Sequence, residues 1–237
     1  MVYRYCESRS FADFASGKVL LHRTGQPNFP VRLAQEIFCR CLQYLDAPGS
    51  VCLYDPCCGG GYLLTVLGFL NYEKIGRIWA SDVSGEAVEL ALENLSLLHK
   101  DGLERRIGQL GRLLREYGRG SHREALDSAA RLMGILDGAG REIEFGAFRA
   151  DILSHDPFGG RGIQADLVFT DVPYGNLVEW SPGGEGVNLL DQLLPVLKDR
   201  GVAAICSDKS QRFRSEHFQR VEKQSVGKRL FQIFQRL

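Results

Sequence analysis

The stretch DPCCGGGY, residues 55–62, decides how this chain folds. It follows a short apolar run at residues 51–54 and precedes residues 63–70, where apolar side chains recur at helical spacing. A buried strand, a glycine-rich turn and a helix together open many nucleotide-binding α/β units, because glycine lets the backbone approach a ligand closely. We therefore expect a strand-to-helix turn at residues 55–62 that contacts a nucleotide-like ligand.

Outward from this turn, strand and helix patterns alternate along the chain. Apolar runs predict strands at residues 78–81, 144–151, 165–171 and 202–206, and helical spacing predicts helices at residues 85–99 and 187–197. An antiparallel pair of strands at the end of the chain fits residues 217–222 and 228–234. The second segment also allows a short helix. The alternation is typical of an α/β fold with a mostly parallel, doubly wound sheet.

We expect a single domain over residues 1–237 with two additions. An N-terminal extension, about residues 1–48, contains a helix that begins near Pro30. Residues 101–141 carry leucines at helical spacing and no β-branched run, which predicts a helical hairpin inserted between strands. Residues 101–142 hold eight arginines and seven acidic residues, and ion pairing on helix surfaces explains this as well as phosphate binding does.

The composition excludes some classes of protein. A chain of 237 residues, 44% hydrophobic, can bury a full core, and its net charge of zero argues against a globally basic nucleic-acid binder. Residues 205–237 are nevertheless basic, with eight Lys and Arg against three Asp and Glu. The seven cysteines form no Cys-x-x-Cys pair, and no secretory or membrane-spanning pattern is present. We expect a cytoplasmic protein with no metal site and no membrane contact.

Four predicted strands end in aspartate: Asp55, Asp82, Asp151 and Asp171. In doubly wound sheets, ligands bind beyond the carboxyl ends of the strands. A carboxylate at Asp82 can accept hydrogen bonds from ribose hydroxyls, and Asp151 can accept one from an adenine amine while Ile152 packs on the ring. A lone aspartate at a strand end is more often a helix cap, but four at one edge indicate a ligand site.

The glycine turn distinguishes between cofactors. Residues 59–64 lack the third glycine of the G-x-G-x-x-G pattern that dinucleotide sites use. S-adenosylmethionine (SAM) has no pyrophosphate and needs only close backbone approach, which Gly59 and Gly61 permit. We expect SAM as the cofactor, with these candidate binding residues: Asp55, Cys57, Gly59, Gly61, Asp82, Asp151 and Ile152.

A second motif, DVPY at residues 171–174, follows the strand that ends in Asp171. It resembles the Asp/Asn-Pro-Pro-Tyr motif of methyltransferases that modify amino groups on bases or on glutamine. A carboxylate only accepts hydrogen bonds, so Asp171 matches the adjacent N1–H and N2–H donors of guanine, and Tyr174 can stack on an extruded base. The candidate catalytic residues are Asp171, Pro173 and Tyr174.

With these motifs the chain resembles the avilamycin-resistance type of 23S rRNA guanine methyltransferases. The matching segments are residues 29–34, 55–68, 80–83 and 170–175. The resemblance implies a Rossmann-like class I SAM methyltransferase, large-subunit ribosomal RNA as substrate and partner, and guanine N1 as the target. The motif type instead favours the exocyclic N2, so both atoms stay open.

Arg32, Lys209, Arg212 and Arg214 are the candidate RNA-binding residues. An arginine on a helix surface is the ordinary alternative for Arg32. We expect a monomer. Two other functions stay open: methylation of an adenine or glutamine amino group, and a related RNA-binding module without catalysis. An NAD-linked oxidoreductase ranks last for want of the third glycine.

Overall fold

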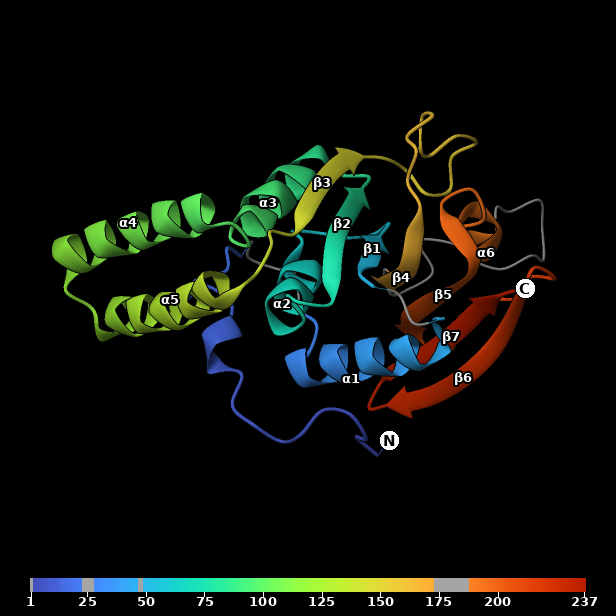
Figure 1. Cartoon of the computed structure of the whole chain (residues 1–237), viewed down its shortest axis with the longest axis horizontal. Helices are drawn as coiled ribbons and strands as arrows, with labels where there is room; N and C mark the ends of the chain where they lie inside the picture. Colours follow the sequence, from blue (N-terminus) through green and yellow to red (C-terminus); the bar gives the residue numbers. More distant parts are fainter. Residues whose placement is uncertain (1, 23–27, 47–48, 173–187) are drawn as a thin grey trace.

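A seven-stranded sheet forms the centre of the molecule in the computed structural model, which describes residues 2–22, 28–46, 49–172 and 188–237 (Figure 1). The strand order is β3-β2-β1-β4-β5-β7-β6. The strands are β1 (Val51–Asp55), β2 (Ile75–Asp82), β3 (Glu144–Arg149), β4 (Ala165–Asp171), β5 (Leu197–Asp208), β6 (Phe218–Val226) and β7 (Arg229–Arg236). The first five are parallel, and β6 and β7 add the antiparallel pair that the sequence predicted.

Each face of the sheet buries its own core, because neighbouring residues of a strand point to opposite faces. Leu53, Leu167 and Phe169 pack on one face with α1 (Val31–Cys41), α2 (Tyr62–Leu70) and α3 (Gly85–Ser96). Tyr54 and Val168 face the other side, where α6 (Leu189–Gln192) and the chain between β3 and β4 cover them. The α/β, mostly parallel architecture is confirmed.

The predicted helical hairpin is present between α3 and β3. It consists of α4 (Lys100–Tyr117) and α5 (Gly120–Gly138), and it extends away from the sheet (Figure 1). At its base, a Cβ on Gly102 would lie 1.9 Å from the carbonyl oxygen of Ser96, so only glycine allows α4 to start this close to the end of α3. Within the described part of the chain, no helix combines the length and apolar character needed to cross a bilayer.

The helix expected over residues 187–197 is present but much shorter than predicted. The helix α6 ends at Gln192, residues 193–196 form turns, and β5 begins at Leu197, where it pairs with Ala165 of β4. Pro195 explains the difference, because proline has no amide hydrogen and its ring clashes with the carbonyl four residues earlier. The leucines of this segment have helical spacing but also fit the turns and the strand start.

The N-terminal segment is held on α1 by a buried network around Glu36. The Glu36 carboxylate accepts the backbone amides of residues 4–6, over 2.8 to 2.9 Å, and the Nε of Arg40 over 2.8 Å. Arg40 also pairs with Glu222 of β6. Burial favours the neutral form of Glu36, but these donors outweigh it and hold its pKa below the usual range. The 3-10 turns η1 (Ala12–Phe14) and η2 (Leu42–Tyr44) complete the described helices.

Candidate functional site

The four strand-end aspartates lie along one edge of the sheet. Asp151, Asp82, Asp55 and Asp171 follow or end β3, β2, β1 and β4, which are adjacent and parallel in that order. Burial raises the pKa of Asp55 to about 7, and the nearby charges of Asp82 and Asp171 add to the rise, which the Thr170 hydroxyl and the Cys57 amide oppose. A cationic ligand would relieve this crowding of carboxylates.

The glycine turn is braced by Asp82. One oxygen of the Asp82 carboxylate accepts the amide of Gly59 over 2.9 Å, and the other accepts the amide of Ser84 over 3.0 Å. Gly61 is the N-cap of α2 and has φ of 73°, and a Cβ there would lie 2.9 Å from the Cα of Ala91 on α3. The turn therefore needs glycine for its backbone angle and for its contact with α3.

Asn94, on α3, is a site residue that the sequence reasoning missed. Its fully buried amide donates to the carbonyl of Gly60 over 2.8 Å and exchanges two hydrogen bonds with the backbone of Leu21. It therefore fixes the glycine turn and the N-terminal segment together. A polar residue on the same helical face as Ala91 and Leu95 was the available signal, since buried amides are kept only where they are hydrogen-bonded.

The predicted cofactor residues fit a nucleoside with a cationic tail. Asp82 uses one acceptor position for the Gly59 amide of the turn and one for the Ser84 amide. A carboxylate has about four acceptor positions, so a ribose diol can still be bound. Asp151 is exposed, its Oδ1 accepts the Leu153 amide over 2.9 Å, and Ile152 beside it is buried. Burial raises the pKa of the Cys57 thiol, so Cys57 is an uncharged, partly buried neighbour of the carboxylates. In the part of the chain that is described, no three His, Cys, Asp or Glu side chains group as metal ligands.

Asp171 ends β4 beside an arginine that the sequence placed only within the basic tail. The Nη2 of Arg229, at the start of β7, lies 3.8 Å from the Asp171 Oδ2. The Arg229 guanidinium also lies over the ring of Phe29, 5.2 Å from its centroid. The predicted catalytic residues Pro173 and Tyr174 lie outside the described residues.

The predicted RNA-binding residues occupy two places. Lys209, Arg212 and Arg214 are exposed on the segment that follows β5, at the same sheet edge as Asp171. The Arg212 guanidinium donates to the Lys209 carbonyl over 2.7 Å. Arg32 lies on α1, where it covers the Tyr3 ring at 4.0 Å and donates to the Cys6 carbonyl, so it also holds the N-terminal segment.

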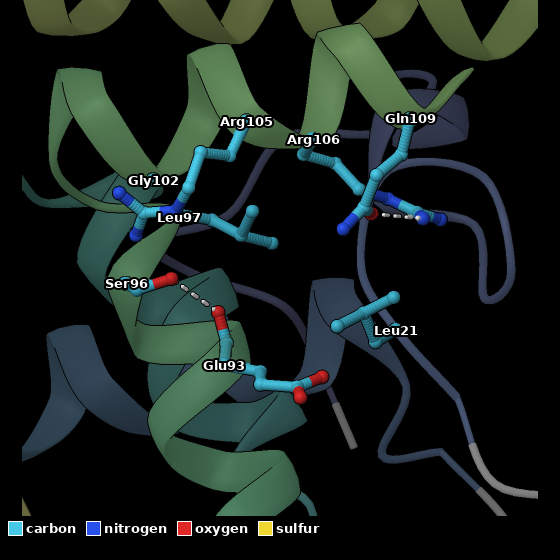
Figure 2. A pocket seen from close by; sticks show the side chains of 8 residues that line it. All are labelled: Leu21, Glu93, Ser96, Leu97, Gly102, Arg105, Arg106 and Gln109. Atoms are coloured by element: carbon cyan, nitrogen blue, oxygen red, sulfur yellow. Dashed lines mark hydrogen bonds between the residues drawn. The ribbon is translucent and has the colours of Figure 1, made fainter. Parts of the chain in front are cut away.

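A cavity of about 250 Å³ lies between α3 and α4, at the base of the hairpin (Figure 2). Its lining comes from α3, α4 and the N-terminal segment: Leu21, Glu93, Ser96, Leu97, Gly102, Arg105, Arg106 and Gln109. The Arg106 guanidinium donates to the carbonyls of Val19 over 2.8 Å and Lys18 over 3.0 Å. These bonds hold the hairpin against the N-terminal segment, and no predicted site residue lines this cavity.

The strand order with its antiparallel β7, the glycine turn and the acid at the end of β2 define a class I SAM-dependent methyltransferase. Solved structures agree at the level of fold: a putative methyltransferase, YhhF from Escherichia coli, matches 90% of this chain and 89% of its own with a TM-score of 0.52 and 13% identity. The family model described as rRNA methyltransferase AviRa matches residues 1–229. The chain belongs to the AviRa family of rRNA methyltransferases.

Two comparisons, both with Streptomyces viridochromogenes, support this membership. The 23S rRNA (guanine(2535)-N(1))-methyltransferase is 37% identical, over 96% of this chain and 93% of that protein. The solved structure of rRNA methyltransferase AviRa has a TM-score of 0.86 and 35% identity, and the match covers 99% of this chain and 96% of that one.

Proposed function

We propose that this chain transfers a methyl group from SAM to the N1 of a guanine in large-subunit ribosomal RNA. The observation that carries the proposal is the Asp171 carboxylate at the end of β4, on the edge that also holds Asp55 and Asp82. Membership of a family with a 23S rRNA guanine-N1 methyltransferase favours N1 over the exocyclic amine.

The cofactor supplies an electrophilic methyl group, and the strand-end residues hold it in place. Asp82 accepts the ribose hydroxyls while its bonds to Gly59 and Ser84 keep its rotamer fixed. Asp151 accepts the adenine amine, and Ile152 packs on the ring. Asp55 and the turn that contains Cys57, Gly59 and Gly61 face the amino-acid part, whose ammonium group complements the acidic cluster.

Asp171 orients the base. Its carboxylate accepts hydrogen bonds from the guanine N1–H and N2–H, which lie side by side on one edge. Guanine N1 is a poor nucleophile while protonated, so a carboxylate that takes its proton assists the transfer. Pro173 and Tyr174 complete this part of the site by prediction from the DVPY motif, with Tyr174 stacking on the base.

The RNA contacts are assigned to exposed cations at the same edge. Lys209, Arg212 and Arg214 follow β5, beside the strand whose end holds Asp171, and Arg32 is the fourth candidate. Phosphate contacts release counterions, so RNA affinity is expected to fall steeply with salt. If RNA affinity did not depend on salt, phosphate contacts could not be the main contribution to binding. The proposal also has the protein acting as a monomer in the cytoplasm.

The test is transfer of labelled methyl from SAM to protein-free large-subunit RNA, small-subunit RNA, transfer RNA and DNA, followed by nucleoside mass spectrometry. Label in N1-methylguanosine from large-subunit RNA alone supports the proposal. Label in N2-methylguanosine corrects the atom, label in adenine or in protein glutamine supports the competing enzymes, and SAM binding without transfer supports a binding module.

The role of Asp171 has its own test. Asp171→Asn is expected to slow transfer by about 100-fold or more while SAM affinity stays close to that of the wild type, because the amide cannot accept a proton. Asp199→Asn is the control, since Asp199 is exposed and pairs with Arg236 away from the site. Equal losses of transfer and of SAM binding would contradict the assignment.

A further inference from the structure

Arg229 and Asp171 present opposite charges side by side at the end of β4. Their Nη2 and Oδ2 atoms are 3.8 Å apart, and both side chains are about one-quarter exposed. The guanidinium is held from below by the Phe29 ring, which itself packs edge-on against Phe169 at 5.7 Å. The pair thus packs on the aromatic core through Arg229, and both side chains remain partly exposed at the surface where a base would enter.

The pair matches one edge of guanine. That edge presents the O6 acceptor next to the N1–H and N2–H donors. A carboxylate can only accept and a guanidinium can only donate, so together they complement all three groups. We propose that Arg229 donates a hydrogen bond to the O6 of the target guanine while Asp171 receives the N1 proton. This inference rests on the proposed function and adds a further catalytic residue to it.

Arg229 has a specific part in the chemistry. When N1 gives its proton to Asp171, the negative charge left on the base is shared with O6, where the guanidinium stabilises it. The N1 electron pair then forms the bond to the methyl carbon, and the electron pair of the broken carbon–sulfur bond stays on sulfur. Adenine carries an amino group where guanine has O6, so it would turn donors toward Arg229 and be rejected.

The surroundings leave room for a nucleotide at this position. A cavity of about 630 Å³ is lined by Arg229, by the turn at residues 226–228, and by Tyr3, Pro30 and Leu33. Its apolar wall, beside Arg229, suits a base that has left its stack. Asp208, at the end of β5, borders the same cavity.

Three other ionisable groups near Arg229 and Asp171 have shifted pKa values, and they bear on any pH dependence of the reaction. On β5, burial raises the pKa of Cys206 well above its usual value, and hydrogen bonds from the Ser210 amide and hydroxyl lower the pKa of Asp208. On β1, Asp55 has a pKa of about 7 and so titrates close to neutral pH. Asp55 is present in every variant, so its titration also appears in the wild-type and Arg77→Met profiles against which Arg229→Met is compared.

The experiment is single-turnover methylation of large-subunit RNA by the wild type, Arg229→Met, Arg229→Lys and Arg77→Met over a range of pH. Arg77 is the matched control. It pairs with Glu144 of the neighbouring strand β3, and both residues lie at the amino ends of their strands, away from Asp171. Arg229→Met is expected to be about 100-fold slower at neutral pH, with unchanged SAM affinity. Arg229→Lys is expected to keep part of the rate, because it retains the charge without the fork of donors.

The pH dependence separates catalysis from structure. The deficit of Arg229→Met is expected to shrink as pH rises toward the point where guanosine N1 ionises by itself, because less charge stabilisation is then needed. A deficit that is constant with pH, or one matched by an equal loss of SAM affinity, overturns the inference, as does an unchanged rate. If the wild type methylates no guanine at all, the proposed function has failed instead.

Discussion

The side chain of Asn94 joins two segments that are far apart in sequence, with its Nδ2 2.8 Å from the Gly60 carbonyl oxygen and its Oδ1 2.8 Å from the Leu21 amide nitrogen. Both segments lie against α3, and neither has regular structure at these residues. The shape of the glycine turn therefore depends on a buried amide that does not belong to the turn.

Asn94→Ala is expected to lower the free energy of unfolding by about 2–4 kcal/mol, because it leaves buried backbone groups of both segments without partners. SAM affinity is expected to fall as well, since the turn loses its support. Urea unfolding and calorimetric titration measure the two effects. Glu89→Ala, at an exposed position of the same helix, should change stability by less than about 0.5 kcal/mol. A similar result for both variants would remove this role of Asn94.

Gly61 and Gly118 provide a matched comparison of two glycines with positive φ. Gly118 has φ of 62°, and a Cβ there would have no atom within 4 Å, so Gly118→Ala adds only backbone strain, about 1 kcal/mol. Gly61→Ala adds a contact of 2.9 Å with the backbone of Ala91 and must displace α3 from the turn. We expect Gly61→Ala to cost clearly more stability and to abolish tight SAM binding, as measured by thermal unfolding with and without SAM. Equal losses of stability in the two variants would show that α3 can move away from the turn without an energetic cost.

The Arg106 bonds to Val19 and Lys18 give a prediction about the hairpin. Arg106→Met keeps the apolar stem and removes donors to two backbone carbonyls, so a loss of about 2–3 kcal/mol is expected. Amide hydrogen exchange should quicken in residues 12–22. Arg105→Met is the control, because Arg105 lines the same cavity but is exposed (Figure 2). The prediction is wrong if exchange in this segment is unchanged by Arg106→Met.

Local patterns were sufficient for most of the fold. Alternation of strand and helix patterns placed the sheet, and the strand-end positions of Asp55 and Asp82 correctly predicted that they lie at one edge of it, because parallel strands end together. The helix expected over residues 187–197 ends at Gln192 instead, since Pro195 outweighs the leucine spacing. The part of the site that depends on sequence-distant contacts was not predictable: nothing near Asn94 or Arg229 in the sequence indicates Gly60 or Asp171 as a partner.

Asp55 gives the final prediction, on the pH dependence of stability. Its pKa in the folded protein is raised from 3.8 to about 7, so the protonated form is the one that the fold favours. The contribution of Asp55 to the free energy of unfolding is fully present below about pH 4, where Asp55 is protonated in both the folded and the unfolded state. This contribution is lost as pH rises through about 7. The full pKa difference between the unfolded and the folded state corresponds to about 4 kcal/mol of unfolding free energy.

Asp55→Asn is neutral at every pH and can still accept the Cys57 amide, which Asp55 binds over 3.0 Å. Its free energy of unfolding is expected to fall less than that of the wild type between about pH 5 and pH 7, and to exceed it near pH 8. Urea unfolding across this range measures both curves. Asp46→Asn, at an exposed ion pair with Arg200, should keep the wild-type slope. Parallel curves for wild type and Asp55→Asn would mean that Asp55 is already ionised at low pH, with its charge compensated inside the fold.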